Sequence, residues 1–106
     1  MPREMAYTDA QGTDHAAAFW TSERYLVDVR AKCARFTFVG FATRDAAVAG
    51  KLPFEERIIA ECDGARYAFY MHRHIADGVP INQIAYELAD EQGKFPESVE
   101  AERLPN

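Results

Sequence analysis

Three runs of alternating apolar residues constrain the fold of this chain more than any other feature. They cover residues 19–32, 33–41 and 54–62. Side chains two positions apart share one face of a strand, so each run can bury one face and expose the other. The stretch between the second and third runs, residues 43–53, is alanine-rich and contains Gly50 and Pro53, which do not continue a strand. The pattern predicts an antiparallel meander of three strands, with one helical turn over Asp45–Ala49.

The join between the first two runs leaves two interpretations open. They meet at Lys32–Cys33 without Gly, Pro, Asn or Asp between them. Tight hairpins usually need such residues, because their turns require unusual backbone angles. A hairpin is our prediction, and one long bent strand is the competing interpretation.

Helical spacing replaces the alternation after Asp63–Gly64. Apolar residues recur at three- and four-residue intervals from Ala65 to Ile75, and Asp63 can cap a helix there. The same segment also alternates from Tyr67 onward, so a fourth strand stays open as an alternative. A second apolar stripe after Pro80 predicts another helix that ends at Gly93.

The 106 residues are enough for one domain with one core. Residues 1–18 show no period and predict an extended N-terminal arm, and residues 94–106 predict an acidic C-terminal tail. The domain between them covers residues 19–93. The predicted fold is therefore α+β: a three-stranded antiparallel β-meander packed with two C-terminal helices, with arms at both ends.

Charge and hydropathy argue against two classes of partner. The net charge is -5, and the basic residues are scattered among acidic ones, so we expect no direct contact with nucleic acid. No apolar run approaches the roughly 18–20 residues that span a bilayer, and the N-terminus lacks the apolar stretch of a secretory signal. We expect no membrane contact.

Few residues suggest catalytic or metal chemistry. His72 and His74 would share one face of a strand, but on a helix they point in different directions, which spoils a metal site. Cys33 and Cys62 lack the spacing of a redox or zinc motif, and whether they are reduced or cross-linked is left open. We expect no enzyme activity, no cofactor and no bound metal.

The aromatic residues point to protein contacts. The chain has seven Phe, five Tyr and one Trp, more than a three-stranded core needs. Exposed aromatic side chains are favoured anchors at protein interfaces. The predicted partner-binding residues are Tyr7, Trp20, Tyr70, Tyr86 and Phe95. Alternatively, Trp20 and Tyr70 merely close the edge of the core.

Three segments carry a resemblance to a known group of proteins: Tyr-Thr-Asp-Ala-Gln-Gly at residues 7–12, Ala-Phe-Trp at 18–20, and the Gly-Phe step with the alanine-rich turn at 39–53. Together they resemble small structural proteins of tailed bacteriophages and prophages. The resemblance implies a virion component, associated with the capsid, neck, tail or fibres and made in the host cytoplasm. It implies several symmetric copies and no catalytic residues.

We therefore expect a non-enzymatic structural or adaptor protein that binds other virion proteins or copies of itself. One alternative is a small binding or regulatory module that acts on a host or phage protein. Another is a metal-dependent enzyme that uses His72 and His74.

Overall fold

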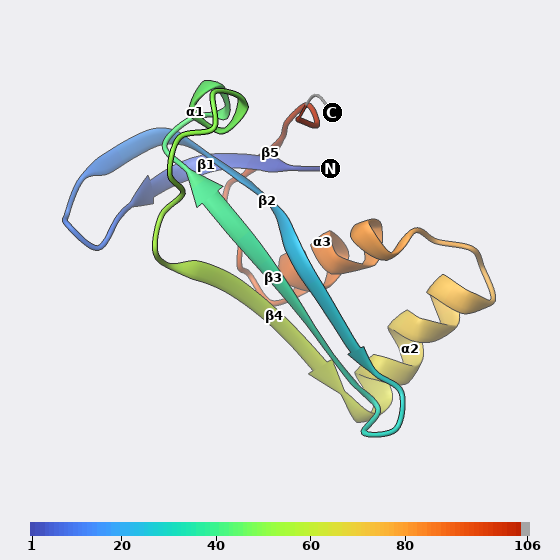
Figure 1. Ribbon diagram of the computed structural model, residues 1–106. Helices are drawn as coiled ribbons and strands as arrows, with labels where there is room; N and C mark the ends of the chain where they lie inside the picture. Colours follow the sequence, from blue (N-terminus) through green and yellow to red (C-terminus); the bar gives the residue numbers. More distant parts are fainter. Residues whose placement is uncertain (105–106) are drawn as a thin grey trace.

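A computed structural model describes residues 1–104 and shows an α+β fold (Figure 1). Five strands form one antiparallel sheet in the order β4-β3-β2-β1-β5. The elements in chain order are β1 (Arg3–Thr8), β2 (Asp14–Asp28), β3 (Cys33–Phe41), α1 (Arg44–Val48), β4 (Arg57–Asp63), α2 (Gly64–Ile75), α3 (Ile81–Glu91) and β5 (Val99–Glu100). The predicted meander is the β2-β3-β4 part of this sheet, and two strands more than predicted extend it.

The β2–β3 connection is a hairpin, as predicted, and its turn is built from unexpected residues. Asp28 pairs with Cys33 at the ends of the two strands. The Asp28 carboxylate accepts a hydrogen bond of 2.9 Å from the backbone N–H of Ala31. Lys32 adopts a left-handed conformation with φ 56°. The side chain of Asp28 thus supplies the turn chemistry that the join itself lacks.

The prediction of an N-terminal arm is wrong, because residues 3–8 form β1 and pair with the first half of β2. The polar residues that follow β1 form the turn between the two strands. Asp9 accepts hydrogen bonds from the backbone N–H groups of Gln11 and Thr13, at 3.0 and 2.9 Å. Gly12 in this turn has φ 83°, a conformation that glycine adopts without strain.

The predicted C-terminal tail also belongs to the domain over most of its length. Phe95 is buried against the core. Val99–Glu100 forms β5 beside β1, and the N–H of Ala101 donates to the carbonyl of Pro2 at 2.8 Å. Residues 105–106 of that predicted tail lie outside the described residues.

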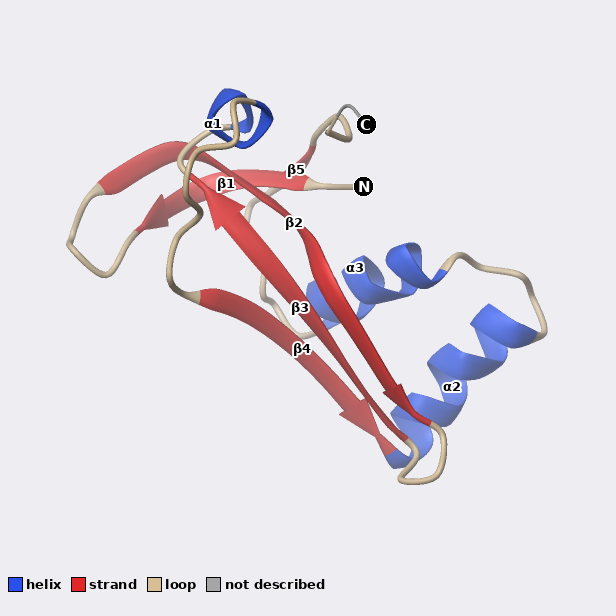
Figure 2. Cartoon of the chain, viewed as in Figure 1, coloured by secondary structure: helices blue, strands red, loops and turns tan. Residues whose placement is uncertain are grey.

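The helices follow the sequence pattern. The segment after Asp63 is helix α2 and not a fourth strand, and α3 begins one residue after Pro80. Gly93 follows α3 with φ 68°, in the position where a helix commonly ends. Figure 2 shows α2 and α3 beside each other along the sheet, with α1 near its opposite end. None of the described helices has the length and apolar character needed to cross a membrane.

The core lies between the sheet and these two helices. Ala34, Phe36 and Phe38 of β3 face it, whereas Arg35 on the opposite face is exposed. Phe38 contacts both Tyr86 of α3 and Phe95, with ring centroids 5.0 Å apart in each pair. The C-terminal segment therefore completes the hydrophobic core.

Candidate interaction surface

Four of the five aromatic residues predicted to bind partners lie in the core, and the fifth, Tyr7, packs against it. Trp20 is fully buried, and Tyr70, Tyr86 and Phe95 are 3–5% exposed. Tyr7 is half-buried and its ring lies 5.1 Å from that of Trp20. The core of a five-stranded sheet with an added C-terminal segment is larger than that of the predicted meander, and it accommodates all five.

The histidine pair of the metal-enzyme alternative, His72 and His74, does not converge on a metal site. His72 is exposed on α2, and Nδ1 of His74 lies 2.7 Å from the carbonyl oxygen of Val79, where it anchors the loop after the helix. Within residues 1–104, no group of three His, Cys, Asp or Glu side chains is arranged to hold a metal ion.

Sequence reasoning missed a polar cluster at the β1–β2 turn. Nε2 of His15 lies 2.9 Å from Oδ2 of Asp9, and this hydrogen bond lowers the pKa of Asp9. The Glu56 carboxylate accepts hydrogen bonds from the Tyr7 hydroxyl (3.2 Å) and from the N–H of Ala10 (2.8 Å). These groups hold the turn against the segment before β4. Their spacing in the sequence gives no signal, since Glu56 is far from the others along the chain.

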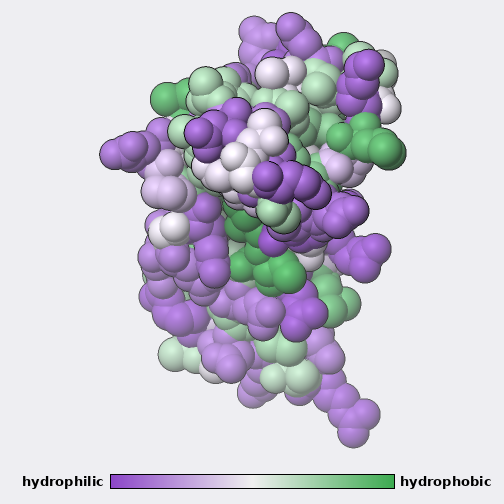
Figure 3. Space-filling model, turned by 90° about the vertical axis from the view of Figure 1, so that its left-hand side faces the viewer, coloured by the Kyte–Doolittle hydropathy of each residue, from purple (hydrophilic) through white to green (hydrophobic). Residues whose placement is uncertain are grey.

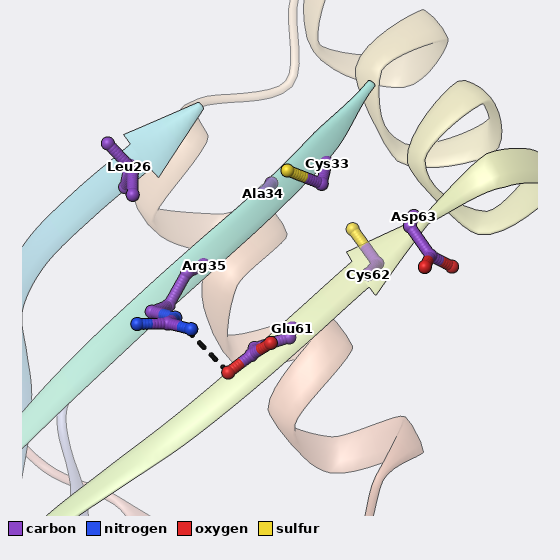
Figure 4. Close-up of a pocket in the computed structure, with 7 residues that line it drawn as sticks. All are labelled: Leu26, Cys33, Ala34, Arg35, Glu61, Cys62 and Asp63. Atoms are coloured by element: carbon purple, nitrogen blue, oxygen red, sulfur yellow. Dashed lines mark ion pairs between the residues drawn. The ribbon is translucent and has the colours of Figure 1, made fainter. Parts of the chain in front are cut away.

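A hollow of about 300 Å³ lies where β2 and β4 end and β3 begins, near α2 (Figure 4). Its lining residues are Leu26, Cys33, Ala34, Arg35, Glu61, Cys62 and Asp63. An ion pair of 3.1 Å joins Arg35 to Glu61 across the two strands.

The two cysteines beside this hollow are free. Cys33 pairs with Asp63 and Cys62 with Ala34, so the two thiols leave opposite faces of the sheet. Burial raises the pKa of the Cys62 thiol, which makes it a poor nucleophile at neutral pH. The Cys62 thiol is therefore not activated for covalent catalysis.

The second half of β2 is the most exposed part of the sheet. β1 pairs with β2 only as far as Trp20, so the following residues have a neighbouring strand on one side alone. Every residue from 23 to 32 is exposed. This run includes Tyr25 and Val27, each 37% exposed, and Leu26, which is 56% exposed. We call Arg24–Asp28 the β2 edge.

The hydrogen-bond pattern shows which backbone groups point outward at the β2 edge. The N–H of Phe54 donates to the carbonyl of Gly40 on the β4 side of β3, and directions alternate along a strand. Phe36 is four residues from Gly40. Its backbone N–H and C=O therefore also point toward β4 and away from β2. Its cross-strand partner Tyr25 consequently directs its N–H and C=O to the open side, and so does Val27.

The other outer strands are less open. The side-chain amide of Gln92 donates to the carbonyl of Glu61 on β4 at 2.6 Å. The guanidinium of Arg57 bonds backbone carbonyls just before the same strand, including that of Glu55 at 3.2 Å. β5 is two residues long. Short edges and polar coverings of this kind discourage strand pairing, whereas no side chain of residues 1–104 bonds the outward backbone groups of Tyr25 and Val27.

The side of the molecule shown in Figure 3 is largely hydrophilic, with a recessed group of apolar residues near its centre. Basic side chains of the described residues are often neutralised: Arg3, Arg57 and Arg73 each pair with a carboxylate within 3.0 Å.

Comparison with known proteins adds no relative: no family model, no curated protein and no solved structure matches this chain. The geometry described above is thus the basis for assigning a function.

Proposed function

We propose that this protein is a non-enzymatic structural or adaptor subunit that joins a multicopy assembly through the β2 edge. The observation that carries this proposal is an unpaired strand whose Tyr25, Leu26 and Val27 are exposed. Unpaired N–H and C=O groups beside apolar side chains are a template for another strand. Addition of a strand to a sheet edge is a recurrent mode of protein recognition.

The polar groups of the protein favour a structural role over catalysis. The carboxylates of Asp9 and Glu56 are occupied by hydrogen bonds that hold a turn. The carboxylate of Glu91 receives the Tyr70 hydroxyl and the Arg66 guanidinium, which ties α3 to α2. Groups already committed to such contacts are poorly placed to transfer protons to a substrate.

The resemblance of residues 7–12, 18–20 and 39–53 to structural proteins of tailed phages suggests where such a subunit acts. We propose the virion, in the capsid, neck, tail or fibres, with other virion proteins or copies of the same chain as partners.

The test is sedimentation of purified particles followed by mass spectrometry, with the wild type and two variants. Leu26→Lys places a charge on the β2 edge, whereas Val29→Lys makes the same chemical change in the adjacent turn, where Val29 is 74% exposed. We expect the wild type and Val29→Lys to sediment with particles and Leu26→Lys to remain in the supernatant. Equal incorporation of both variants would refute the role of the edge. A soluble wild type bound to one host or phage protein would favour the binding-module alternative.

A further inference from the structure

We propose that the occupant of the β2 edge is a second copy of this chain, paired antiparallel about a two-fold axis at Leu26. This inference rests on the proposed function and specifies the partner. Two five-stranded sheets would then join into one continuous sheet, with α2 and α3 of both copies on the same side.

The backbone of the β2 edge suits this arrangement. With the axis at Leu26, Tyr25 of each copy lies opposite Val27 of the other. Both residues direct their N–H and C=O groups to the open side, so each such pair exchanges two hydrogen bonds. The two Leu26 residues form the central pair without hydrogen bonds, in which Cα atoms approach to about 4.5 Å and side chains are closest. Leu26, which is 56% exposed in the monomer, becomes covered by its own copy.

Charge complementarity identifies a second copy as the occupant. The same register places Arg24 of each copy opposite Asp28 of the other, which gives two ion pairs on either side of the leucines. Arg24 forms no ion pair among residues 1–104. The hydrogen bond that Asp28 accepts from Ala31 uses Oδ1 and leaves Oδ2 available.

Other two-fold registers along the edge are poorer. An axis at residue 24 or 28 brings identical charges together, Arg24 against Arg24 or Asp28 against Asp28. An axis at residue 25 places Arg24 opposite Leu26, and an axis at residue 27 does the same for Asp28. Like charges directly opposite each other destabilise a strand pair, and opposite charges stabilise it. The sequence of the β2 edge is thus self-complementary about Leu26.

A charge exchange tests this register, with molar mass measured by sedimentation equilibrium. Arg24→Asp alone and Asp28→Arg alone each convert both attractive pairs into repulsive ones. We expect the wild type to dimerise and each variant to dimerise at least about tenfold more weakly. An equimolar mixture of the two variants should form a heterodimer, because both cross-strand pairs are then of opposite charge.

Asp28→Arg also removes the turn hydrogen bond to Ala31, so this variant alone could lose dimerisation through a folding defect. Formation of the heterodimer would show that both variants are folded and that charge repulsion prevents each from pairing with itself. A second readout is cross-linking of Leu26→Cys in a background that carries Cys33→Ser and Cys62→Ala. Mild oxidation should give a disulfide-linked dimer, while Val29→Cys in the same background should stay monomeric.

Two results would overturn the proposal: a wild type that stays monomeric at high protein concentration, or a variant mixture that does not associate although both variants are folded. If Leu26→Lys is nevertheless lost from particles, the proposed function stands and the occupant is another protein. If the dimer forms as described but no copy is found in particles, the inference stands and the virion assignment fails.

Discussion

Gly40→Ala should destabilise this protein more than a single added methyl group suggests. Gly40 lies opposite Trp20 in the sheet, and the indole crosses the space where a Cβ would be. That Cβ would lie 2.6–2.7 Å from three carbons of the six-membered ring. Trp20 is fully buried with Tyr7 and Phe54 against it, so it cannot move aside freely. Overpacking of this kind costs about 1–3 kcal/mol, which lowers the melting temperature by roughly 4–8 °C per kcal/mol.

The assay is urea and thermal unfolding of a double-mutant cycle with Trp20→Phe, which removes the ring atoms that meet the new methyl group. The cost of Gly40→Ala should fall by at least about 1 kcal/mol in the Trp20→Phe background. The control is Gly93→Ala, where φ is 68° and no atom lies within 4 Å of the added Cβ. Its cost of about 1–2 kcal/mol comes from the backbone and should be the same in either background. Equal costs of Gly40→Ala with and without the indole would refute the steric explanation.

Three further predictions concern the core and its titratable groups. Phe95→Ala should cost about 3–5 kcal/mol by urea unfolding, because Phe95 is 5% exposed and packs against Phe38; a cost below about 1 kcal/mol would show that the C-terminal segment is dispensable. Burial and the Glu91 carboxylate raise the pKa of Tyr70 to about 12 from 10.0, so the folded state holds this proton more tightly than the unfolded state. The stability that results is complete below pH 10 and is lost as the pH rises from 10 to about 12. In urea unfolding, Tyr70→Phe should therefore lose less free energy of unfolding than the wild type across that range. An equal loss in both proteins would contradict the raised pKa of Tyr70. A thiol reagent at pH 8 should label half-buried Cys33 before buried Cys62, and equal rates in the native protein would contradict the placement of Cys62.

The central elements were predictable because each has a strong local period. The alternation in residues 33–41 and the helical stripe after Pro80 each survive in the structure almost unshifted. The hairpin between β2 and β3 was harder, since its turn depends on the Asp28 side chain and a left-handed Lys32, neither of which is the usual turn signal.

The terminal strands were missed for different reasons. β1 does carry a weak alternation, with Met5 and Tyr7 inward on either side of exposed Ala6, but six residues beside a polar turn look like an arm when read alone. β5 is two residues long, too short for any period. The burial of Phe95 follows from the pairing of β5 with β1, a contact between the two ends of the chain that no local pattern reports.

The misplaced aromatic residues follow from the same omission. A small core of three strands and two helices cannot bury all five of these aromatic residues, and this is why the sequence predicts them at an interface. Once both terminal segments join the sheet, these rings contact the core, and the hydroxyl of Tyr86 accepts the N–H of Ser22 at 3.0 Å. Alternation along β2 separates Tyr25 and Val27 from Leu26, but it could not show that β1 stops at Trp20 and leaves one side of the strand unpaired.

Strand β2 serves both the core and the proposed interface, because its first half pairs with β1 and its second half is the β2 edge. At Phe19 and Trp20 the strand pairs with both β1 and β3, and at Ser22 the Tyr86 hydroxyl takes the place of a further β1 residue. A bulge between Ser22 and Arg24 then separates this half from the β2 edge. Bulges usually turn an edge away from partners, but here the strand continues beyond the bulge with three apolar residues, Tyr25–Val27, between Arg24 and Asp28. The first half of β2 therefore completes the sheet of its own chain, and the second half presents a regular unpaired ladder to another.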